Sequence, residues 1–99
     1  VVLPPMKVGL LTVCLRLYAI ESIKARRSVV KRILADVRRL GPSFAVCELP
    51  ESNGLTDVKL RIAHVSGDAR FTDSALRRLA ERLEHSGEYE VAESGIEVL

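Results

Sequence analysis

The chain has 99 residues, enough for one domain with a modest core, because a chain of this length buries roughly 60–70% of its unfolded surface. Apolar residues make up 47% and charged residues 28%, and no apolar run reaches the ~20 residues of a membrane-spanning helix, which predicts a soluble globular protein without a membrane partner. The net charge of +2 hides a division: residues 1–47 hold nine Lys and Arg and two acids (+7), and residues 48–99 hold six and eleven (−5).

The first predicted strand runs from Met6 to Leu17. Residues 1–5 precede it and are interpreted as an N-terminal extension, which leaves residues 6–99 as a single domain. Both phases of the strand are largely apolar, as in a central strand packed on two sides. We expect one phase to face the helices, namely Leu11, Val13, Leu15 and Leu17; the other phase consists of Val8, Leu10, Thr12, Cys14 and Arg16.

A strongly amphipathic helix is predicted from Ser22, a suitable N-cap, to Leu40, where Gly41-Pro42 ends it. Its apolar arc covers roughly 140° and consists of Ile23, Val29, Val30, Ile33, Leu34, Val37 and Leu40. Four cations align within roughly 60° on another side and are called the ridge here: Lys24, Arg27, Lys31 and Arg38. Arg32 and Arg39 flank the ridge, and all six are predicted to bind nucleic acid, although a solvated helix face is the alternative.

The next two strands are predicted at residues 43–49 and 57–66. The turn between them spans residues 50–56 and is tightest at Asn53-Gly54. The second of these strands alternates cleanly between apolar and polar residues, which indicates one exposed face.

A second helix is predicted to begin at Thr72 or Asp73 and to end near residues 86–87. The last strand is predicted at residues 89–99, with a bulge near Ser94-Gly95, where the alternation of its side chains slips.

This order predicts an α+β fold of the ferredoxin-like βαββαβ type, a four-stranded antiparallel sheet with two helices on one face. Right-handed connections place the first and third strands in the middle of the sheet. One sheet face is then left without helices, and such a face usually binds a partner or a second copy. We therefore expect a symmetric homodimer formed through Val8, Leu10, Thr12 and Cys14.

Catalytic, metal and cofactor motifs are not apparent, so the prediction is a non-enzymatic protein without a cofactor or metal. Cys14 and Cys47 lie in apolar runs and far apart, which favours buried thiols in a reducing cytoplasm over a disulfide. His64, Ser66 and Asp68 bring an imidazole, a hydroxyl and an acid together, but the segment is more typical of a turn capped by Asp68. The third strand offers Lys59, Arg61 and His64 to a nucleic-acid backbone but no aromatic side chain for base stacking.

Two charged residues depart from the pattern of their elements. Arg26 projects into the apolar arc of the first helix, and Glu48 shares a phase with Phe44 and Val46. A half-buried cation needs a partner, so we predict an ion pair between Arg26 and Glu48; the alternative is that both reach water at the ends of their elements.

Three stretches resemble the YlxP-like family, domain-of-unknown-function family 503: VGLLTVCLRL, SIKARRSVVKRILADVRR, and SFAVCEL followed by RIAHVSGD. The family pattern Ser-Leu-Lys-Glu-Lys-Arg is carried by Ser22, Ile23, Lys24, Arg26 and Arg27, with Ala25 in place of Glu, and the family's tryptophan-containing stretch after Pro50 is missing. The resemblance implies a ferredoxin-like fold without established biochemistry. It also implies an RNA-linked role by association, because genes of the family often lie beside genes for translation initiation and ribosome maturation.

Two functions remain open from the sequence. The first is a small bacterial cytoplasmic protein that binds RNA or the ribosome through the basic helix. The second is a homodimeric protein-interaction module that uses the helix-free sheet face.

Overall fold

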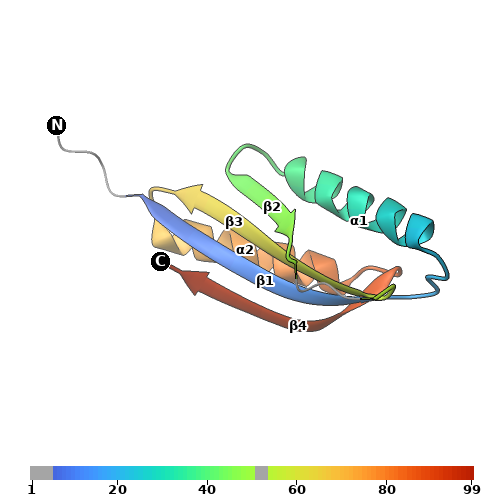
Figure 1. Ribbon diagram of the computed structural model, residues 1–99. Coiled ribbons are helices and arrows are strands. Elements are labelled where there is room, and N and C mark those ends of the chain that lie inside the picture. Colours follow the sequence, from blue (N-terminus) through green and yellow to red (C-terminus); the bar gives the residue numbers. More distant parts are fainter. Residues whose placement is uncertain (1–5, 51–53) are drawn as a thin grey trace.

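The computed structural model describes residues 6–50 and 54–99, so the predicted extension at residues 1–5 and the predicted turn tip at Asn53 lie outside the described residues. Six elements follow one another in the order expected for a ferredoxin-like fold: β1 (Lys7–Leu17), α1 (Ile23–Arg38), β2 (Phe44–Glu48), β3 (Asp57–Ser66), α2 (Ala69–Glu84) and β4 (Tyr89–Val98) (Figure 1). Neither helix in these described ranges is both long and apolar enough to cross a membrane.

The four strands form one antiparallel sheet in the order β2-β3-β1-β4, with β1 and β3 in the middle as predicted. Both helices cover the same face of the sheet (Figure 1), but they cover different strands. α1 packs mainly against the edge strand β2, whereas α2 packs against β1, β3 and β4. The two helices therefore lie apart.

The core lies between the sheet and the helices. The predicted inward phase of β1 is buried, and Leu11 and Val13 have no exposed surface. On β3 the inward phase is Val58, Leu60 and Ile62, each no more than 1% exposed. Burying an aliphatic side chain of this size stabilises a fold by about 1.5–3 kcal/mol, so these two central strands supply much of the driving force for folding.

α1 begins where the sequence predicts it. Ser22 is extended and its Oγ accepts a hydrogen bond from the Ala25 backbone N–H at 3.0 Å, and the chain leaves the helix through Gly41 at φ 124°, a conformation that favours glycine. The helix buries only part of its predicted apolar arc, namely Val29, Val30, Ile33 and Val37. Ile23 is 61% exposed, because it lies at the first position of the helix and beyond the sheet.

The predicted start of α2 is wrong by about one turn. The helix begins at Ala69 because Asp68 is its N-cap, and the Asp68 carboxylate accepts a hydrogen bond from the Arg70 backbone N–H at 2.9 Å. Thr72 is a buried residue in the first turn, not a cap.

The bulge in β4 is also displaced from its predicted position. Cys14 is paired with Glu93 and Leu15 with Val91, so Ala92 is the extra residue, and Ser94 and Gly95 pair regularly with β1. The slip in alternation at Ser94 reflects side chains on an exposed edge strand, where burial does not constrain residue type.

The prediction of two buried thiols is wrong for Cys47, which is exposed, while Cys14 is half-buried. Both thiols are free. Cys47 is exposed because β2 is an edge strand on which Ala45 and Cys47 point to the helix-free face, away from α1.

α2 approaches β1 most closely at Gly9. A Cβ atom at this position would lie 2.5 Å from Thr72 Cγ2 and 2.7 Å from Leu76 Cδ1, well inside van der Waals contact. Glycine therefore fits this close approach, because a Cβ would force the Thr72 and Leu76 side chains, or α2 itself, to shift.

We predict that Gly9→Ala lowers the free energy of unfolding by about 2 kcal/mol, as overpacking of a tight contact does, and the melting temperature by about 10 °C. Thermal unfolding followed by circular dichroism measures the shift. Gly95→Ala is the matched control on the neighbouring strand, since a Cβ there meets open space. Equal melting temperatures for the two variants would contradict a steric role for Gly9.

Candidate functional site

The ridge is the most concentrated unneutralised charge on α1. Lys24, Arg27, Lys31 and Arg38 are all exposed, and none of them forms an ion pair with an acid in the described part of the chain. At a rise of 1.5 Å per residue the four positions extend over about 21 Å of the helix. The ridge is thus a straight, solvated row of cations.

Arg32 and Arg39, the other two cations predicted to bind nucleic acid, each have an acidic partner. Arg32 Nη2 lies 2.6 Å from Glu88 Oε2, and Arg39 Nη1 lies 2.6 Å from Asp36 Oδ1. Both pairs are about half exposed or more, so each adds little stability, but each offsets one positive charge. The net positive charge of α1 is consequently concentrated on the ridge.

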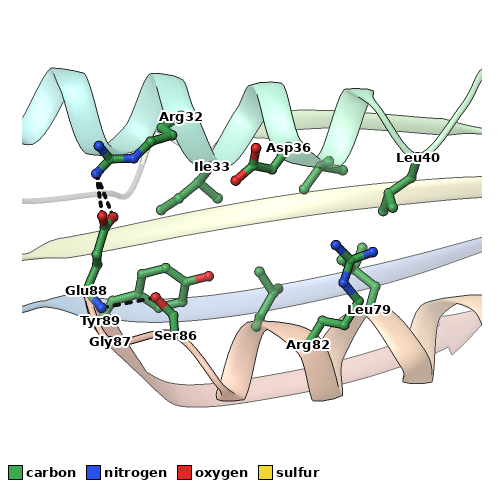
Figure 2. Close-up of a pocket in the computed structure, with 12 residues that line it drawn as sticks. Arg32, Ile33, Asp36, Leu40, Leu79, Arg82, Ser86, Gly87, Glu88 and Tyr89 are labelled. Carbon is green, nitrogen blue, oxygen red and sulfur yellow. Dashed lines mark hydrogen bonds and ion pairs between the residues drawn. The ribbon is translucent and has the colours of Figure 1, made fainter.

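A groove of about 410 Å³ separates the two helices, and Arg32 and Asp36 line its α1 side (Figure 2). Its inner wall is apolar and includes Ile33, Leu79 and Tyr89. The ridge lies roughly 130° around α1 from Arg32 and Asp36, and therefore on the flank of the helix that faces away from α2.

Sequence reasoning did not find the groove, because it arises from the separation of two helices that cover different strands. Tyr89 is 7% exposed, and burial raises the pKa of its phenol, although a hydrogen bond with Ser86 opposes the shift. A phenol whose pKa is raised is a neutral hydrogen-bonding group at pH 7, and it lies here beside exposed ion pairs.

The predicted ion pair between Arg26 and Glu48 is present. Arg26 Nη2 lies 2.8 Å from Glu48 Oε2 and also donates a hydrogen bond to the Asp57 carbonyl at 3.0 Å. The Arg26 side chain is only 14% exposed, and its buried Nε has no hydrogen-bond partner. One guanidinium thereby joins the first turn of α1 to the end of β2 and the start of β3.

His64 lies on the helix-covered face of β3, not on the open face with Lys59 and Arg61, and is 2% exposed. Its ring lies between Phe44 and Phe71, with centroid distances of 4.6 and 5.6 Å. His64 Nδ1 is 3.0 Å from Thr72 Oγ1. Burial lowers the pKa of the imidazole, so the ring is neutral at pH 7.

His64 and Thr72 belong to a hydrogen-bonded cluster that continues through Ser66 to Asp68, the N-cap of α2. Thr72 Oγ1 lies 2.6 Å from Ser66 Oγ, which donates to the Asp68 carbonyl at 2.8 Å. The turn capped by Asp68 is therefore confirmed, and the cluster holds the start of α2 against β3. Thr72, which sequence reasoning assigned to a helix start, is its central member; its lone hydroxyl carries no sequence signal for this role.

The helix-free face contains the residues predicted to form a dimer, and all four are half-buried within one chain: Val8, Leu10, Thr12 and Cys14. Charged neighbours border them, since Arg61 Nε donates to Thr12 Oγ1 at 3.1 Å and Glu97 pairs with Leu10 across the strands. The face is therefore mixed in character. The histidine, cysteine and acidic side chains of the described residues form no group of three that could hold a metal ion.

Comparison with known proteins places the chain by family and fold. The family described as "Protein of unknown function (DUF503)" matches residues 8–96. Among solved structures, the de novo designed protein Foldit4 is similar, with a TM-score of 0.55 and 14% identity over 96% of this chain and 97% of that chain. Such a distant likeness shows the fold alone. No curated protein matches the chain.

We predict that Glu48→Gln lowers the free energy of unfolding by about 1–3 kcal/mol, because it leaves a mostly buried guanidinium without its carboxylate. Urea denaturation at pH 7 measures the loss. Glu90→Gln is the control, since its partner Arg16 is 58% exposed and the pair contributes less than about 1 kcal/mol. Equal losses in the two variants would show that Arg26 is solvated.

We predict that His64 makes the fold sensitive to acid. The pKa is lowered in the folded state, so the unfolded chain binds the proton first, and stability falls as the pH drops below 6.5 towards the lowered value. The slope is at most about 1.4 kcal/mol per pH unit, the value for one proton. Urea denaturation at several pH values between 7.5 and 5 measures the free energy of unfolding, which should fall with this slope in the wild type and in His85→Gln. A slope that persists unchanged in His64→Gln would assign it to other groups.

Proposed function

The chain belongs to the DUF503 family of proteins of unknown function, and from its charge distribution we propose that it is a non-enzymatic RNA-binding protein. In this proposal the ridge on α1 contacts the phosphate backbone of RNA, free or within the ribosome. The observation that carries the proposal is the concentration of four exposed cations, without acidic partners among the described residues, on one flank of one helix.

The spacing of the ridge suits a polyanion. Lys24, Arg27 and Lys31 are separated by three and four residues, about 4.5 and 6 Å along the helix, so that each long side chain can reach a different phosphate. Each neutralised phosphate releases condensed counterions, and this entropy gain drives sequence-independent binding. The translation-linked role implied by the family resemblance favours RNA over other polyanions.

The ridge consists only of Lys and Arg, which contact phosphate and carry no base-reading geometry along a solvated helix. We therefore propose binding through the backbone, without sequence preference. Arg32 and Arg39 contribute less than the ridge, because Glu88 and Asp36 offset their charges.

A second candidate function is self-association through the helix-free face. One observation favours it: apolar side chains gather at the end of the sheet where β1 begins. Val65 pairs with Val8 and is 40% exposed, and Leu99, which is 62% exposed, donates its backbone N–H to the Val8 carbonyl. Leu10 lies next to them on the same face, so a twofold pairing would cover these residues.

We predict that wild-type protein binds a labelled 20-nucleotide uridine RNA with an affinity that falls with salt, at a log–log slope of about −3 for four phosphate contacts on a single strand. Fluorescence anisotropy between 30 and 300 mM KCl measures the slope. The triple variant Lys24→Glu, Arg27→Glu, Lys31→Glu should weaken binding more than about tenfold at low salt, because it removes three of these contacts and adds repulsion.

The matched control is Arg70→Glu, Arg78→Glu, Arg82→Glu, which makes the same change of net charge on exposed positions of α2. Equal losses of RNA affinity in the two triple variants would show that net charge, and not the ridge, determines binding. Absence of RNA binding by the wild type at 30 mM KCl would contradict the proposal. Light scattering on the same samples addresses self-association: a dimer mass that becomes monomeric in Leu10→Arg would support the second candidate.

A further inference from the structure

The outer edge of β2 carries backbone groups that are not used by the sheet. Leu49 donates its N–H to the Lys59 carbonyl at 2.8 Å, and Val65 donates to the Ser43 carbonyl at 3.1 Å. Because hydrogen-bonded positions alternate along an antiparallel pair, the backbone N–H and C=O groups of the odd-numbered residues of β2 point towards β3, and those of the even-numbered residues point away from it. The N–H and C=O groups of Val46 and Glu48 therefore point outward, without a partner among the described residues.

The other edge of the sheet is protected in ways that β2 is not. β4 has a bulge at Ala92 and places Glu90, Glu93 and Glu97 on its helix-free side, and bulges and charges on an edge strand discourage pairing. On β2 the helix-free positions are Ala45 and Cys47, both small, uncharged and exposed. β2 is therefore the more open edge.

The flank of α1 that faces away from α2 lies on the side of this edge, because α1 packs against β2. Arg32 and Asp36 line the groove beside α2, and the positions opposite them on the helix are Ile23, Leu34 and Arg27, which lie within roughly 40° of one another. Because α1 packs against β2, the edge strand, this flank of α1 lies on the side of the sheet edge, where Arg27 is exposed and Leu34 is half-buried against the core. Ile23 is 61% exposed, and the ridge continues from Arg27 on the solvent side.

We propose that the β2 edge binds an extended acidic peptide segment as an added strand, a site beyond the proposed RNA contact. An added strand would lie about 4.8 Å from β2, beneath the outer flank of α1. Its backbone would pair with Val46 and Glu48. Because alternate side chains of a strand point to opposite faces, its carboxylates would meet Arg27 and its neighbours on the ridge, and its apolar side chains would lie on the helix-free face beside Ala45 and Cys47.

Charge selects this occupant over a second copy of the chain. Pairing of two β2 strands about a twofold axis would bring two α1 flanks together, and four ridge cations from each copy would repel one another. An acidic peptide replaces this repulsion by attraction. Since the peptide carboxylates and RNA phosphates use the same cations, peptide and RNA would compete for the protein.

The test uses wild-type protein and the acetylated, amidated heptapeptide of sequence EVEVEVE. By NMR, saturating peptide should slow hydrogen exchange of the Val46 and Glu48 backbone amides at least tenfold relative to free protein. The fully N-methylated peptide keeps the charges but cannot pair as a strand, and it should give no protection. The peptide KVKVKVK should not bind.

Protection of these amides that is equally strong with the N-methylated peptide, or protection on β4 instead of β2, would overturn the proposal.

Val46→Pro provides a separate check. The Val46 N–H makes no bond to β3, so a proline is tolerated at this edge position. The variant should lose peptide binding and keep RNA binding. Loss of peptide binding with retained RNA binding in any variant separates this inference from the proposed function. RNA that fails to displace the peptide would overturn the shared use of the ridge.

Discussion

At Gly9 the side chains of α2 rest directly on the backbone of β1, and the placement of the other elements depends on this contact. Because α2 lies so close to the central strand, Thr72 reaches His64 and Ser66 on β3, and Leu76 is completely buried. α2 thereby occupies the middle of the sheet face. The space that remains for α1 is over β2, at the edge.

The position of α1 explains how its charges are divided. Arg26 points into the layer between helix and sheet, where Glu48 and the Asp57 carbonyl receive it. Arg32 faces α2 across the groove and meets Glu88 (Figure 2). The cations on the remaining flank have neither a sheet nor a helix beside them. An edge helix on a narrow sheet must leave one flank in water, and here that flank holds the ridge.

The sheet edges differ for a related reason. β4 contacts α2 and is protected at its outer edge by its own acids and by the bulge at Ala92. β2 is short and lies beneath α1, and its only acid, Glu48, is engaged by Arg26. The basic helix α1 thus lies over one edge strand of the sheet, and the acidic strand β4 forms the other edge.

Local sequence determined the elements of this protein. The inward phase of β1, the alternation of β3 and the cap at Ser22 depend on neighbours a few residues away, and they were predictable for that reason. The pair of Arg26 and Glu48 was predictable because each breaks the apolar pattern of its own element. Only the tertiary structure decided the contacts between distant segments: Gly9 under Thr72, the groove between the helices, the partners of Arg32, and the exposure of Cys47. These depend on how far apart the helices lie on the sheet, a distance set by packing across the whole core and by no single stretch of sequence.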